Sequence, residues 1–141
     1  YLTDSDSFHD PSFISALDSL PKENPISLYT SSCNRDNALE TFYRKWSGGI
    51  SHFYSKGMIE EILDASEQID KSNAWDYRFP ELLKKEFLVT RTSYLDHLGA
   101  YGIHSGNDWN HDRAKNPTKY LRARRDPFIN YIEGRASSYT L

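Results

Sequence analysis

Apolar residues recur every three or four positions along much of the chain, which is the spacing of amphipathic helices. The first such run follows Asp10-Pro11 and ends at Pro21. Asp accepts hydrogen bonds from the free amides of a first helical turn, and Pro suits the first helical position, so this pair predicts a helix start. Residues 25–30 favour β structure instead, and we expect a lone short strand or an extended connector there.

Three further apolar stripes predict longer helices. One covers residues 39–46 and stops at Gly48-Gly49, and the second covers residues 56–69. The third predicts the longest helix, over residues 80–100, with Gly99 at its end.

The last third of the chain predicts a loop and then two short helices. Residues 103–115 are rich in Gly, Asn, Asp and His, which is typical of an ordered loop. Asn116-Pro117 and Asp126-Pro127 repeat the pairing of a cap residue with proline. The expected fold is therefore mainly α: a single compact helical domain over residues 1–141, with five to six helices and at most one short strand or extended connector.

Composition predicts an aromatic core and argues against two protein classes, disulfide-stabilised scaffolds and membrane-spanning proteins. Ten Tyr, seven Phe and three Trp in 141 residues predict a core built from large rings. The single cysteine, Cys33, excludes an internal disulfide and favours a reducing, cytoplasmic location. No apolar run approaches the roughly 20 residues of a membrane-spanning helix. The chain starts at Tyr1, which leaves open an upstream segment that was removed.

Charge is unevenly distributed along the chain. Residues 1–76 carry a balance of −7 and residues 77–141 a balance of +4, within a net charge of −3. A basic stretch without any acid contains Arg113, Lys115, Lys119, Arg122, Arg124 and Arg125. These cations are candidates for contacts with phosphates, and nearby aromatic residues could stack on exposed bases. The alternative is a solvated helix face that pairs with the acidic half of the chain.

A second candidate site is the loop that begins at His104. His104, Asp108 and His111 could converge on one divalent metal ion, with His97 as a further ligand. Imidazole and carboxylate together suit zinc, iron or manganese. The alternative is a turn-rich loop in which Asp side chains accept hydrogen bonds from backbone amides.

Cys33 offers a third kind of chemistry. It lies at the expected start of a helix, where partial positive charge favours the thiolate. A cysteine before a helix, with a distant His and an Asp or Asn, is similar to the arrangement in papain-like and transglutaminase-like enzymes. Cys33 would then be the nucleophile, His104 the base, and Asp108 or Asn110 the orienting residue. The alternative is a buried or incidental thiol.

The seven residues from Arg91 to His97 resemble the Arg-x(4–6)-His element of the helical ribonucleases called HEPN domains. The resemblance implies that Arg91 and His97 line a cleft and cleave RNA without metal. Six residues place the two side chains about 240° apart around an ideal helix. A bend or a helix end would therefore be needed to bring them together.

Three classes of function follow. The favoured one is a helical binding module that recognises an anionic partner, RNA, DNA or an acidic protein, through residues 113–125. The second is a small hydrolase or nuclease that uses the His-rich residues 97–112. Its chemistry would be metal-assisted, or would use Cys33 as a nucleophile with His104 and Asp108, or would resemble a ribonuclease with Arg91 and His97. The third is a non-catalytic interaction subunit. The acidic overall balance argues against a general DNA binder, which is usually strongly basic.

Overall fold

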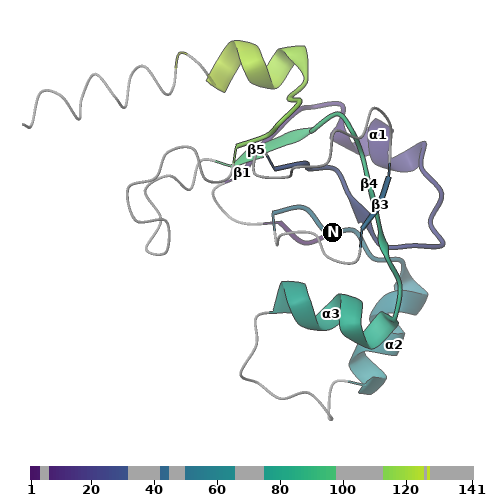
Figure 1. Ribbon diagram of the computed structural model, residues 1–141. Coiled ribbons are helices and arrows are strands. Elements are labelled where there is room, and N and C mark those ends of the chain that lie inside the picture. Colours follow the sequence, from purple (N-terminus) through teal and green to yellow (C-terminus); the bar gives the residue numbers. More distant parts are fainter. Residues whose placement is uncertain are drawn as a thin grey trace, which may run out of the picture.

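The protein is a mixed α/β structure in which helices pack around two small sheets (Figure 1). The computed structural model describes residues 1–3, 7–31, 42–44, 50–65, 75–97, 113–125 and 127. The elements in chain order are β1 (Ser7–His9), α1 (Phe13–Asp18), β2 (Ile26–Ser27), β3 (Phe42–Arg44), α2 (Lys56–Ala65), α3 (Trp75–Leu83), β4 (Phe87–Val89) and β5 (Leu95–His97). Residues 119–125 are also helical. The expectation of a mainly α domain with five to six helices is wrong.

The larger sheet has the order β2-β4-β3, with β4 in the centre. β4 pairs in parallel with β2, where Ile26 lies opposite Leu88, and antiparallel with β3, where Tyr43 lies opposite Leu88. The smaller sheet is the antiparallel pair of β1 and β5, with Phe8 opposite Asp96.

The central strand β4 divides the apolar core into two clusters, because successive side chains of a strand point to opposite faces. Phe87 and Val89 belong to the cluster that contains Met58 and Ile62 of α2 and Leu83 of α3. Leu88 belongs to the other cluster, whose members are Leu17, Ile26, Leu28, Leu88 and Leu95. Both faces of β4 are therefore covered, one by α2 and α3 and the other by α1.

The helix expected over residues 80–100 is wrong. Pro80 lies inside α3, which ends at Leu83. Lys84 then has a φ of 51°, a left-handed conformation that stops a helix. Because β4 is buried on both faces, its apolar residues are consecutive and match a helical stripe as well as a strand.

The helix expected from the apolar stripe over residues 39–46 is also wrong, because residues 42–44 form β3. Within residues 25–30, where we expect a lone short strand or an extended connector, Ile26–Ser27 form the strand β2, which is not alone but pairs with β4; all six residues are buried. The helices expected after Asp10-Pro11 and over residues 56–69 are confirmed as α1 and α2 in their described parts. None of the described helices is long and apolar enough to cross a membrane.

A tethered basic segment as the candidate binding site

Residues 113–125, the basic segment, form one end of the described structure. In Figure 1 their helix lies at the top, while α2 and α3 lie at the opposite end. The start of the segment is bonded to two distant parts of the chain. Lys115 N–H donates to the Thr30 carbonyl at 2.8 Å, and Thr118 N–H donates to the Ser93 carbonyl at 3.1 Å. Ser93 N–H in turn donates to the Asn116 carbonyl at 2.8 Å.

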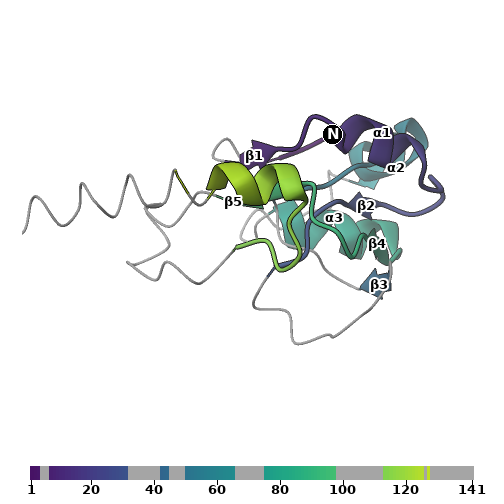
Figure 2. The ribbon, with the colours of Figure 1, turned by 90° about the horizontal axis from the view of Figure 1, so that it is seen from above.

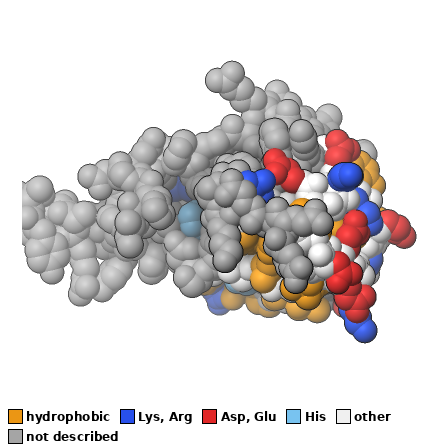
Figure 3. Space-filling model, turned by 90° about the horizontal axis from the view of Figure 1, so that it is seen from below, with side chains coloured by type: hydrophobic (Ala, Val, Ile, Leu, Met, Phe, Trp, Pro, Cys, Tyr) orange, Lys and Arg blue, Asp and Glu red, His pale blue; other side chains and the backbone are white. Residues whose placement is uncertain are grey.

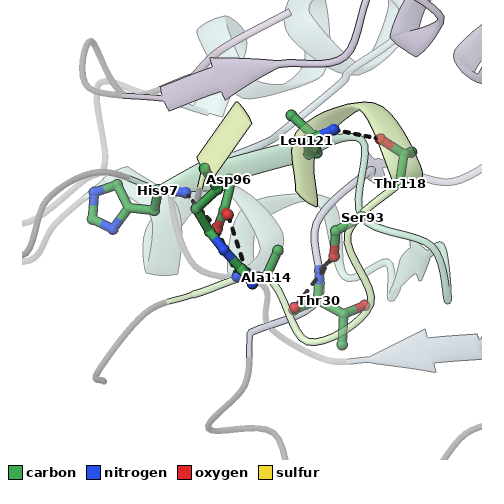
Figure 4. Close-up of polar contacts among 8 residues, drawn as sticks. Thr30, Ser93, Asp96, His97, Ala114, Thr118 and Leu121 are labelled. Carbon is green, nitrogen blue, oxygen red and sulfur yellow. Dashed lines mark hydrogen bonds and ion pairs between the residues drawn. The ribbon is translucent and has the colours of Figure 1, made fainter. Parts of the chain in front are cut away.

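The Ser93 side chain connects the two parts of the chain, around Thr30 and Ser93, to which the basic segment is hydrogen-bonded (Figure 4). Its fully buried hydroxyl accepts from Thr30 N–H at 3.0 Å and lies 3.3 Å from the Thr30 carbonyl. This pairing satisfies buried polar groups that would otherwise be costly to remove from water. The Ser93 hydroxyl therefore connects the two parts of the chain on which the basic segment lies.

Asp10 fixes the start of helix 119–125. One oxygen of its buried carboxylate accepts from the amide and the hydroxyl of Ser12, at 2.8 and 2.6 Å. The other oxygen accepts from the Thr118 hydroxyl. Burial raises the pKa of Asp10, but these three hydrogen bonds outweigh it and hold the pKa below its ordinary value.

Thr118 is the N-cap of helix 119–125. Its hydroxyl oxygen accepts from Leu121 N–H at 3.2 Å, which satisfies one of the free amides of the first turn. Leu121 is fully buried and anchors the inner face of the helix. Thr118 therefore couples the helix cap to Asp10 across 108 residues of chain.

Asp96 holds the two ends of the basic segment together. One of its carboxylate oxygens accepts from the amides of Ala114 and His97, at 2.8 and 3.2 Å. The other oxygen lies 3.4 Å from the Arg125 guanidinium. Burial raises the pKa of Asp96, and the Ala114 amide and the charge of Arg125 counteract only part of that effect.

Three cations of the helix face solvent. Lys119, Arg122 and Arg124 are exposed, and none has an ion pair with a residue that the structure describes. The Arg124 guanidinium lies 4.1 Å from the centre of the Tyr120 ring, a cation–π contact. Figure 2 looks down on this end and shows the helix uncovered by any other described element.

The acidic helix α2 does not neutralise these cations, because it lies at the far end of the molecule (Figure 1). Its Glu60 pairs with Lys56 at 3.6 Å, and on α3 Glu81 pairs with Arg78 at 3.4 Å. Figure 3, which views the molecule from below, shows acidic and basic side chains beside an apolar area. The pairing of the acidic half with helix 119–125, considered from sequence, is not seen among the described residues.

The other basic residues of the segment have different environments. Arg125 forms an ion pair with Asp96, and its side chain is 20% exposed. Arg113 and Lys115 are half-buried beside Ala114. The exposed cations available to a partner are therefore Lys119 and Arg122, on one side of the helix, and Arg124, which lies about 160° around the axis from Arg122.

The HEPN-like pair does not lie on a helix. Arg91 is exposed in the turn after β4, and His97 is the last residue of β5. In Figure 4 the His97 ring points away from the Asp96 carboxylate. The helical setting that the resemblance implies is absent from residues 91–97.

The remaining candidates lie outside the described residues. They are Cys33, His104, Asp108, Asn110 and His111, so the nucleophilic triad and the metal site stay predictions. Within the described ranges, no group of three His, Cys, Asp or Glu residues is arranged to hold a metal ion.

His52 is a buried histidine that the sequence analysis did not single out. It is fully buried, its Nδ1 lies 3.0 Å from the Tyr54 hydroxyl, and its ring centre lies 4.4 Å from that of Phe87. A ring enclosed by aromatic side chains fits a core role.

The sequence does not reveal the groups that position the basic segment. It indicates Asp10 only as a local cap and assigns no positioning role to Asp96, Ser93 or Thr118. The signal for Thr118 was present, because Thr follows Asn116-Pro117 directly before the helix. Comparison with known protein families, curated proteins and solved structures finds no match to this chain.

Proposed function

We propose that the protein binds nucleic acid through the exposed cations of helix 119–125. The observation that carries the proposal is the group of Lys119, Arg122 and Arg124, three exposed cations on a helix whose inner face is fixed by Leu121 and Asp96. A helix backbone that is already held in place does not have to become ordered when a polyanion binds. The mechanism is charge recognition and involves no covalent step.

Lys119 and Arg122 are three residues apart and lie on the same side of the helix. They suit contacts with neighbouring phosphates, each of which releases counterions. With three contacts to a single strand, the logarithm of the association constant should fall with the logarithm of salt concentration with a slope of about −2.

Arg124 favours a single strand over a duplex. Its guanidinium is held against the Tyr120 ring at 4.1 Å, which fixes the orientation of this planar group. A planar guanidinium can stack on an unpaired base, and such stacking is common in single-strand recognition. Bases inside a duplex do not offer a face for this contact.

The test is fluorescence anisotropy with a labelled single-stranded RNA oligonucleotide at about 50 mM salt, where phosphate contacts are strongest. The variant replaces Lys119, Arg122 and Arg124 with Gln. The matched control replaces Lys56, Lys84 and Lys85 with Gln, which removes the same charge from exposed positions elsewhere. We expect the first variant to lose at least about tenfold in affinity and the control less than about twofold.

Absence of binding at low salt, or equal losses in both variants, would contradict the proposal. A polyglutamate peptide provides the comparison with acidic proteins. If it binds the wild-type protein more tightly than the RNA does, the partner is an acidic protein and the nucleic-acid assignment is wrong.

A further inference from the structure

We draw no further inference here: the strongest candidate, the open pocket of about 310 Å³ between α1 and the turn that joins β4 to β5, carries nothing, because its one charged lining residue, Arg91, already interacts with another group and nothing in the structure shows what charge a ligand would meet there.

Discussion

The Asp96 carboxylate lies 3.4 Å from the Arg125 guanidinium and accepts a hydrogen bond from the Ala114 amide at 2.8 Å. One buried acid thus closes the basic segment into a loop by contacting both of its ends. The surface that we propose for binding is therefore positioned from inside the fold, by residues that do not touch the partner.

The substitution Asp96→Asn should lower the free energy of unfolding by about 1–3 kcal/mol. Asn retains an oxygen that can accept from Ala114, but its amide NH2 then faces the Arg125 guanidinium, so that a donor meets a donor. Urea unfolding at pH 7 measures the loss. Asp64→Asn on the exposed face of α2 is the control and should change stability by less than about 0.5 kcal/mol. Equal effects of the two substitutions would show that Asp96 does not stabilise the segment.

Asp96 and Asp10 should give stability opposite dependences on pH. The pKa of Asp96 is raised in the folded protein, so the folded state binds more protons than the unfolded state above pH 3.8. Its contribution to stability therefore falls as pH rises from 3.8 through the folded pKa. The pKa of Asp10 is lowered, so its contribution is present above pH 3.8 and is lost as pH falls from there through the folded pKa.

Urea unfolding of the wild type, Asp96→Asn and Asp10→Asn across the acidic range measures both effects. The destabilisation caused by Asp10→Asn should shrink below pH 3.8, where the wild-type carboxyl takes up its proton. In Asp96→Asn, the gain in stability on acidification towards pH 3.8 should be reduced relative to the wild type. A larger gain in that variant would contradict the raised pKa.

The sequence predicts the local parts of this structure and misses the non-local ones. α1, α2 and the helix at 119–125 each follow from a cap signal or an amphipathic stripe of adjacent residues. β3 and β5 have three residues each, which is too short for an alternating pattern to stand out. Their existence depends on pairing with β4 and β1, and local spacing carries no information on that pairing.

The same distinction holds for the candidate site. The cations of the basic segment are adjacent in sequence, and the sequence identifies them as a group. The acids that hold the segment, Asp10 and Asp96, lie outside it, and one sequence does not show that Asp10 reaches Thr118 across 108 residues. The sequence therefore indicates the cations that we propose as the binding site, and the structure identifies the residues that position them.

Thr118→Ala should destabilise the protein by about 1–2 kcal/mol, because it removes the helix cap and one hydrogen bond to Asp10 together. Thr118→Ser retains the hydroxyl and is the matched control. Thermal and urea unfolding of both variants measure the difference. If Ser destabilises as strongly as Ala, the lost methyl group and not the hydroxyl is responsible, and the cap assignment is wrong.

Arg124→Lys separates stacking from charge in the proposed interaction with RNA. Lysine keeps the positive charge but lacks the planar group that lies on Tyr120, so affinity for a single strand should fall by about threefold to tenfold. The salt dependence should stay close to that of the wild type, because the number of cations is unchanged. Arg122→Lys is the control: Arg122 has no ring contact with a described residue, and its replacement should change affinity by less than about twofold. Anisotropy titrations of both variants at two salt concentrations provide the comparison. Equal losses in the two variants would mean that Arg124 acts only through its charge, and the preference for unpaired bases would have no basis.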